Sequence, residues 1–427
     1  MSRTNIFPNL PPMEAKDGLA GKTVHYGAGN YVTLVEHTTK AEYDAYLAEL
    51  TQAGYSVFVS NKDSLDGVVL STTLVKDNTV LTVTHILRRK RTYISFCADL
   101  PLSEHLFYKA EYIKDNKPNA KTTLHMLELW HFGNSFVIQL KNGHFLISDG
   151  GGGYEIRYLL DYLESLVPQG EKPVVDGWFI SHGHSDHHGA LGAFFWEKGG
   201  ELTDRICVEG IYFNQPNDSV YQRDPWTWLS VAEIRGAARY LRNSAGKHPP
   251  IYRPQTGQRY YFNDITVDII HAQEQLPNED YQNEDYPGDF NDSSTWCMVT
   301  IEGQKVLFSG DGDIGAMEVL MKTYDSSYFH LNLMTLMHHG FNTYDKFTDY
   351  IKAETVLATV RDKLPVCRTR QNAYFKEKVK EWFVWGEGTR VFTFPYRAGE
   401  SRLLPHFDWK YHQGKTRPVQ NNLDVPV

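Results

Sequence analysis

One short stretch of the sequence concentrates the residue types that bind metal ions. Within seven positions it places His182, His184, Asp186, His187 and His188. The apolar run before it, residues 174–180, predicts a buried strand. Clustered imidazoles repel one another when protonated, whereas neutral imidazole suits zinc and a nearby carboxylate compensates the charge of the ion. A histidine-rich surface loop is the alternative, but the strand before the stretch and the helical pattern after it favour a metal-binding loop.

Further strand-like runs end in residues of the same kind. They are Asp149 after residues 145–148, Asp311 after residues 306–308, and His338 and His339 after residues 331–336. Helical patterns alternate with strand patterns around these runs, which predicts a layered α/β arrangement with the chemistry at the ends of strands.

The His-x-His-x-Asp-His spacing of residues 182–187, joined by Gly-Asp at 310–311 and a later histidine, resembles the pattern of the metallo-β-lactamase fold hydrolases. The resemblance covers about residues 122–400. It implies an α/β fold, a four-layered αββα sandwich with the site at one edge of the paired sheets. The nearest likeness is to the β-lactamase-like domain of the DNA-uptake competence proteins and their soluble relatives, through His-His-Gly at 338–340 and Asn-Asp-Ser-Ser at 291–294.

This resemblance implies a role for each candidate residue. His182 and His184 would bind a first divalent metal, and Asp186 and His187 a second. Asp311 would bridge the two metals, and Asp186 would also orient the attacking hydroxide, so these two aspartates are the expected catalytic residues. The remaining assignments are His339 as the last ligand of the second metal, His338 as the alternative to His339, and Asp149 as a support of the metal loop from outside the ligand shell.

The chain departs from the family pattern at two places. The family usually supplies another histidine for the first metal, and the corresponding region here holds His271, an acidic loop at Gln273–Asp289, and then Asn291. His271 is a candidate for the missing ligand, and Asn291 is the alternative, on the expected substrate side. Competence-type nucleases also carry a Gly-Gln-Gly-Asp-like turn where residues 131–134 read His-Phe-Gly-Asn, and this loss of an acidic residue argues against nuclease activity.

These assignments predict a metal-dependent hydrolase in which two divalent metals share a hydroxide. The ions lower the pKa of the shared water and stabilise charge on the attacked oxygen, so no serine or cysteine nucleophile is needed. We expect zinc, with manganese or iron as alternatives, and a phosphoester, in particular a phosphodiester, as the small-molecule substrate. A carboxylic ester, lactone, thioester or β-lactam is the runner-up. Further alternatives are a nuclease and a metal-poor binding protein that has lost activity.

Composition limits the partners and the compartment. The 427 residues carry a formal net charge of −9, which provides no general attraction for nucleic acid or for an anionic membrane. The four cysteines are widely spaced, without a Cys-x-x-Cys pair, as is typical of reduced thiols. We therefore expect a soluble, cytoplasmic protein that acts on a small molecule, with no membrane partner and with nucleic acid not favoured.

The order of the predicted strands and helices divides the chain into four parts. Residues 1–22 are predicted to form a flexible arm, and residues 23–120 a small α+β domain. Its helix, at about 39–53, is expected to carry an apolar stripe that includes Tyr43 and Leu50. Residues 121–400 are predicted to form the hydrolase domain, and residues 401–427 a C-terminal tail.

Overall fold

The structure, a computed structural model, covers most of the chain. The acidic loop predicted at Gln273–Asp289 lies outside the described residues, as do most of the predicted arm and tail. None of the described helices combines the length and the apolar character that crossing a bilayer would require. The described residues are 10–11, 13, 22–27, 30–62, 65–98, 101–130, 133–214, 229–272, 290–360 and 369–406.

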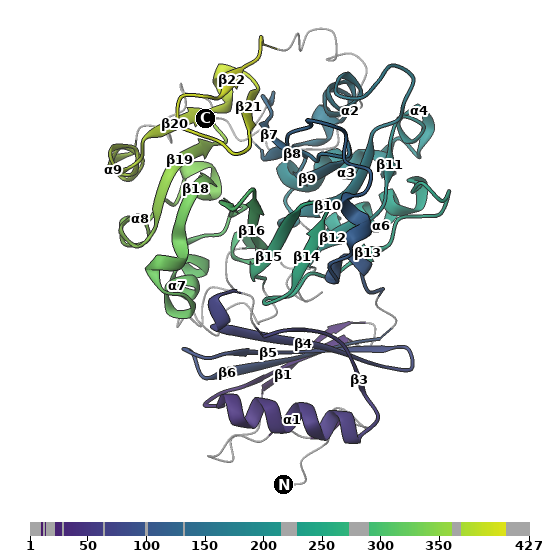
Figure 1. The fold of residues 1–427 in the computed structure, drawn as a ribbon, viewed down its shortest axis with the longest axis vertical. Coiled ribbons are helices and arrows are strands. Elements are labelled where there is room, and N and C mark those ends of the chain that lie inside the picture. The colour runs from purple at the N-terminus through teal and green to yellow at the C-terminus, as the bar shows by residue number, and fades with distance from the viewer. Residues whose placement is uncertain are drawn as a thin grey trace.

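In the described part of the chain, the N-terminal unit is a six-stranded antiparallel sheet with helix α1 (Lys40–Gln52) across one face (Figure 1). Thr39 and Glu42 form a capping box, in which each side chain accepts a hydrogen bond from the main-chain N–H of the other. As the sequence predicts, Tyr43 and Leu50 on the apolar stripe of α1 are buried. The strands, in the order β1-β2-β6-β5-β4-β3, are β1 (Lys22–Gly27), β2 (Asn30–Val35), β3 (Ser56–Asn61), β4 (Val69–Lys76), β5 (Thr79–Ile86) and β6 (Arg91–Ala98).

The other face of this sheet packs on the rest of the molecule. The Thr84 hydroxyl donates to the carbonyl oxygen of Thr256 at 3.1 Å. Arg88, in the turn between β5 and β6, donates to the carbonyl oxygen of Tyr324 at 2.7 Å. Apolar side chains of β2, β4, β5 and β6 belong to the same buried cluster as Tyr324. The N-terminal unit is therefore docked through an apolar interface with polar contacts at its border.

The second sheet is mixed. Strands β7, β8 and β9 run antiparallel, and parallel pairings then join β9, β10, β12 and β13. β22 pairs with β21, so the sheet continues into the stretch predicted as a tail. The strands, which the described residues place in one nine-stranded sheet, are β7 (Thr123–Met126), β8 (Ser135–Gln139), β9 (Phe145–Asp149), β10 (Val174–Ile180), β11 (Cys207–Val208), β12 (Ile211–Phe213), β13 (Ile251–Tyr252), β21 (Arg390–Thr393) and β22 (Arg402–Leu403).

The third sheet repeats this plan. Its first four strands pair antiparallel, and its last four strands pair parallel. The strands, in sequence order across the sheet, are β14 (Arg259–Phe262), β15 (Ile265–His271), β16 (Trp296–Ile301), β17 (Gln304–Phe308), β18 (His330–Thr335), β19 (Lys352–Ala358) and β20 (Glu381–Val384).

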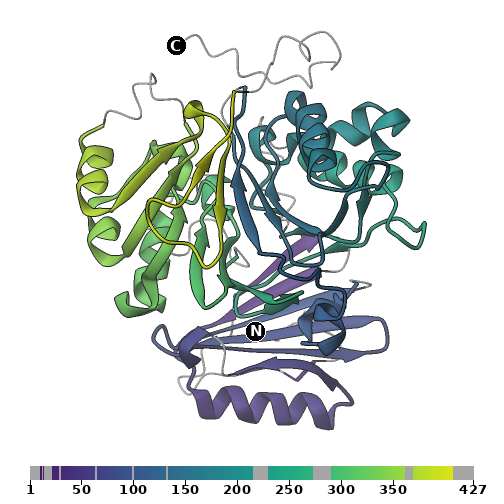
Figure 2. The same ribbon diagram turned by 45° about the horizontal axis from the view of Figure 1, so that its top comes forward.

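The second and third sheets pack face to face between two layers of helices (Figure 2). Phe136 of β8 meets Phe308 of β17 across the interface, with ring centroids 5.4 Å apart. The predicted four-layered αββα sandwich is thus confirmed by the arrangement of sheets and helices. The helices are α2 (Ile156–Ser165), α3 (Ser185–Trp196), α4 (Gly200–Thr203) and α6 (Ser230–Tyr240) outside the second sheet, and α7 (Ile314–Thr323), α8 (Asp345–Tyr350) and α9 (Arg370–Lys378) outside the third.

The close approach of the N-terminal unit to the sandwich can be tested at Gly257. This residue has φ +90°, and a Cβ atom there would lie 2.7 Å from the Cβ of Ser71. Gly303, in the turn between β16 and β17, has φ +75° with open space around it. We expect the positive φ to lower the free energy of unfolding of both alanine variants by about 1 kcal/mol. In Gly257→Ala the free energy of unfolding should fall by about 1–3 kcal/mol more, because the added methyl group overpacks the interface. Equal losses in urea unfolding would contradict the packing described.

Candidate metal centre

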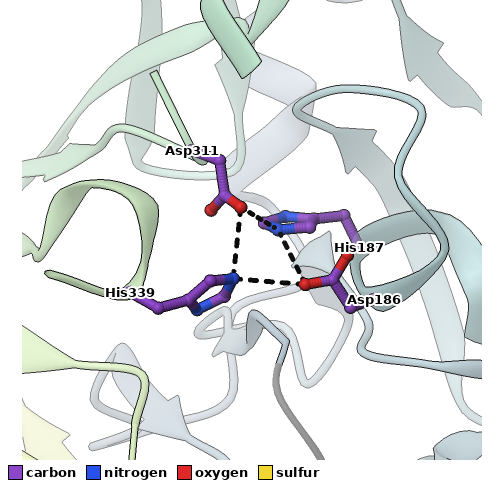
Figure 3. A group of neighbouring side chains, drawn as sticks. All are labelled: Asp186, His187, Asp311 and His339. Atoms are coloured by element: carbon purple, nitrogen blue, oxygen red, sulfur yellow. Dashed lines mark ion pairs between the residues drawn. The ribbon is translucent and has the colours of Figure 1, made fainter. Parts of the chain in front are cut away.

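Four side chains from three separate parts of the sequence converge on one point (Figure 3). They are Asp186, His187, Asp311 and His339, and each offers a ligand atom within 4.8 Å of the others. Three of them are buried, and Asp186 is partly exposed. Nitrogen and carboxylate oxygen atoms at this density are a suitable donor set for zinc and related divalent ions.

The ends of three strands position these side chains. Asp186 and His187 lie in the first turn of α3, which His184 begins as the N-terminal cap after β10. Asp311 follows β17, and His339 lies in the tight turn after β18. The group therefore draws two residues from the second sheet and two from the third, across the interface between the sheets.

The ring of His187 is oriented by Asp149. The Oδ2 atom of Asp149 lies 2.9 Å from His187 Nδ1, and its Oδ1 atom accepts the main-chain N–H of Ser181 at 2.7 Å. A carboxylate only accepts, so Nδ1 of His187 carries a proton and Nε2 is directed to Asp311 Oδ2, 3.0 Å away. His187 Nε2 is buried and makes no hydrogen bond within the described residues. This is the arrangement that a metal-ligating histidine needs.

His339 is oriented in the same way by Thr359. Its Nδ1 atom lies 2.9 Å from the Thr359 hydroxyl and 3.2 Å from the Thr359 carbonyl oxygen, which can only accept. Its Nε2 atom lies 3.2 Å from a carboxylate oxygen of Asp186 and 3.2 Å from one of Asp311. The residues present therefore fit a divalent metal ion, with two imidazole Nε2 atoms and two carboxylates facing the same point.

The charges of the group depend strongly on one another. Burial acts to lower the pKa of His339, but the carboxylates of Asp311 and Asp186 outweigh it and raise that pKa to about 9. Burial likewise acts to raise the pKa of Asp311, but the imidazoles of His187 and His339 hold it well below its ordinary value. Two carboxylates at this depth thus require positive charge beside them, which protonated imidazole or a metal ion can provide.

The other two predicted metal ligands lie beside this group. His182 is fully buried, and its Nε2 atom lies 3.0 Å from Nδ1 of His184. The rings of His182 and His187 are 4.2 Å apart between centroids. Burial, together with the neighbouring imidazoles, lowers the pKa of His182 well below its ordinary value, which keeps it neutral as a ligand must be. The structure thus places the predicted first-metal pair next to the second-metal group.

His338 and His339, the two alternative ligands in the turn after β18, have different surroundings. His339 belongs to the group of four, whereas His338 lies outside it. His338 Nδ1 is 3.3 Å from Asp313 Oδ1, and its Nε2 atom is 3.3 Å from the side-chain amide of Asn291. The predicted candidate His271 is buried at the end of β15 and is not part of the described group.

The sequence did not predict a contact with the metal-loop residues or Asp311 for two buried residues, Asn134 and Glu233. Asn134 reaches Asp311 through its side-chain amide. Glu233, on α6, is buried and pairs with His188, whose Nδ1 atom donates to the carbonyl oxygen of His184 at 2.9 Å. Glu233 stands 45 positions beyond His188 in a helix without distinctive spacing, so no sequence signal linked the two.

Comparison with known proteins gives structural likenesses only. No protein-family model matches the chain, and no curated protein matches it. Zinc-bound PqqB from Methylobacterium extorquens is similar over 60% of this chain and 86% of its own, at 11% identity and a TM-score of 0.39. A metal-dependent hydrolase of the β-lactamase superfamily, Tm1679, is similar over 63% and 98%, at 11% identity and a TM-score of 0.35. A metallo-β-lactamase from Hirschia baltica is similar over 68% and 70%, at 10% identity and a TM-score of 0.23.

The sheet order and the position of the four side chains decide the fold. Two mixed sheets pack between helical layers, and the candidate ligands lie where their strands end. The chain has the four-layered αββα architecture that its resemblance to the metallo-β-lactamase fold hydrolases implies. The nearer likeness to the DNA-uptake competence proteins stays a prediction from the sequence.

The support that Asp149 gives to His187 predicts a loss of metal affinity in Asp149→Ala. Removing a carboxylate that orients a ligating histidine typically costs 10–100-fold in affinity, and we expect a loss of about that size for zinc. Asp176→Ala is the matched control, because Asp176 pairs with His144 at a similar distance of 2.8 Å outside the group. Competition with a fluorescent chelator measures both affinities. Equal zinc affinities for Asp149→Ala and the control would contradict the role of Asp149.

Proposed function

We propose that this chain is a metal-dependent hydrolase of the metallo-β-lactamase superfamily. The observation that supports the proposal is the group formed by Asp186, His187, Asp311 and His339, whose ligand atoms lie within 4.8 Å of one another. Both histidines have Nδ1 committed to a protein partner, so both present Nε2 to the group. Structural ion pairs rarely need this orientation of two imidazoles towards shared carboxylates, whereas metal ligands do.

In this proposal the four residues hold one divalent metal, and His182 and His184 hold a second, with Asp311 shared between them. When bound, the metals supply a hydroxide near neutral pH and a Lewis acid for the attacked centre. Asp186 is the partly exposed member of the group, and its carboxylate can accept a proton from the attacking water. Zinc suits the mixed nitrogen and oxygen donors, with manganese or iron as alternatives.

The polar groups beside the centre can bind the substrate. His338 is 20% exposed in its side chain, and Asn291 lies next to it with its amide 3.3 Å from His338 Nε2. The amide nitrogen of Asn291 carries two hydrogens, so it can donate to His338 and also to an oxygen atom of a phosphoryl or acyl group. We propose a phosphoester small molecule, in particular a phosphodiester, as the substrate. The net charge of −9 favours a small molecule over nucleic acid.

Apolar side chains beside the same turn favour a second candidate. Phe341 is 49% exposed, with its ring 5.5 Å from that of His338 between centroids. Ile314 is 45% exposed and directly follows Asp313, which pairs with His338. An apolar rim suits a substrate with an apolar group, so a carboxylic ester, lactone, thioester or β-lactam is the alternative to a phosphodiester.

A substrate panel tests the proposed activity. Protein stripped with a chelator and resupplied with zinc, manganese or iron should hydrolyse a bis-aryl phosphate faster than a lactone, a thioester or a chromogenic β-lactam. Asp311→Ala should lower kcat/KM by about 1,000-fold or more, because the proposed bridging ligand is lost. His144→Ala, in a histidine away from the group, is the control and should keep full activity. Activity that persists in Asp311→Ala would exclude this site.

Metal stoichiometry tests the proposed dinuclear centre. We expect two equivalents of zinc per chain, with the tighter one held by the group of four. His339→Ala should remove the tight equivalent, whereas His182→Ala should keep it and lose the weaker one. Elemental analysis with chelator competition measures both. Less than one equivalent in wild-type protein purified without chelator would favour a metal-poor binding protein over a hydrolase.

A further inference from the structure

Asn134, directly before β8, lies against the group of four from within the protein. Its side chain is buried, with 2% of the residue exposed. The amide nitrogen Nδ2 lies 3.5 Å from Asp311 Oδ1 and 3.5 Å from His187 Nδ1. It therefore contacts two of the four candidate ligands at once.

Donor chemistry selects which of these contacts is a hydrogen bond. His187 Nδ1 donates its proton to Asp149, so it has no lone pair to offer Asn134. The carboxylate of Asp311 accepts only, which requires the nitrogen of the amide, rather than its oxygen, on that side. The Asn134 side chain is thus a donor to Asp311, at the outer limit of hydrogen-bond distance.

The main chain of the same residue supports the metal loop. The N–H of Asn134 donates to the carbonyl oxygen of Asp186 at 3.2 Å, and its carbonyl oxygen accepts from Gly150 at 2.9 Å and Gly151 at 2.8 Å. The preceding Gly133 has φ +150°, and a Cβ atom there would lie 2.5 Å from the Asp186 carbonyl oxygen. The turn at 133–134 therefore joins the loop of Asp186 to the glycine run that follows Asp149.

Burial of the Asn134 side-chain amide does not by itself stabilise the fold. Its Oδ1 atom is buried and makes no hydrogen bond within the described part of the chain. An unsatisfied buried oxygen of this kind lowers the free energy of unfolding. The favourable part of the side chain is the contact of Nδ2 with Asp311.

We propose that Asn134 is a positioning residue that orients the bridging carboxylate of Asp311 for the metal ions. The proposal rests on the proposed metal centre. A neutral donor fits this position because an aspartate would place another buried negative charge against Asp311 when no metal is bound. The asparagine at the position where competence-type nucleases carry an acidic residue, which argued against nuclease activity, is then compatible with a metal centre.

Zinc affinity and melting temperature of the full-length protein test this role. Asn134→Ala should bind zinc 10–100-fold more weakly than wild type in competition with a fluorescent chelator. The matched control is Asn214→Ala: Asn214 is also buried, and its amide donates to the carbonyl oxygen of Pro254 at 2.6 Å, away from the group. The control should bind zinc within about threefold of wild type, a margin well below the loss expected for a ligand-supporting residue.

Asn134→Asp provides a second readout that a purely structural role would not change. Without metal, Asn134→Asp should have a lower melting temperature than Asn134→Ala, because the new carboxylate faces the carboxylate of Asp311. Zinc should raise its melting temperature more than it raises that of Asn134→Ala, because the ion neutralises the added charge. Should Asn134→Ala not fold, as judged by circular dichroism, Asn134→Ser is measured against the same criteria.

The outcomes separate the two proposals. Zinc binding by wild type with unchanged affinity in Asn134→Ala, or an equal loss in Asn214→Ala, would overturn the role of Asn134 alone. Equal zinc-induced stabilisation in Asn134→Asp and Asn134→Ala would also overturn it. A wild-type protein that binds no zinc would overturn the metal centre and this role together.

Discussion

Two carboxylates that converge at one point, Asp186 and Asp311, are the constraint on which the two-sheet sandwich and its candidate metal centre depend. Like charges at this depth repel strongly, because little water is present to screen them. The imidazoles of His187 and His339 lie between them and hold the pKa of both carboxyl groups below its ordinary range, although burial acts in the opposite direction. A divalent ion would satisfy the same charges better than protons do, which is why this arrangement is best explained as a metal centre.

Holding such a group requires that no ligand can turn away. Each histidine is fixed from behind, His187 by Asp149 and His339 by Thr359. Asn134 joins the main chain of Asp186 to the glycine run and reaches the carboxylate of Asp311. These supporting residues lie at the ends of different strands. The two sheets must therefore keep their relative position for the candidate ligands to meet. The sandwich therefore does more than bury apolar surface: its interface sets the geometry of the centre.

The N-terminal sheet packs against the sandwich. One face carries α1, and the other packs on the sandwich through an apolar cluster that includes Tyr324, while Arg88 donates to the carbonyl oxygen of that residue. Thr84 bonds to Thr256, whose hydroxyl in turn bonds to Ala272 at the end of β15. Thr256 therefore links the N-terminal sheet to Ala272, the residue that directly precedes the acidic loop in the sequence.

The sequence by itself determined the local features. The apolar stripe of α1 follows from spacing, as does the strand β10 that ends in the histidine stretch, because both depend on residues close together in the chain. The four-layered fold followed from the family resemblance. Only the tertiary structure shows that the ring of His339, and not that of His338, faces the carboxylates of Asp186 and Asp311, because adjacent residues in a turn point in different directions and Thr359 holds the ring of His339. Likewise, the contacts of Asn134 with Asp311 and of Glu233 with His188 join residues 177 and 45 positions apart, and only the pairing of strands and helices brings them within hydrogen-bond distance.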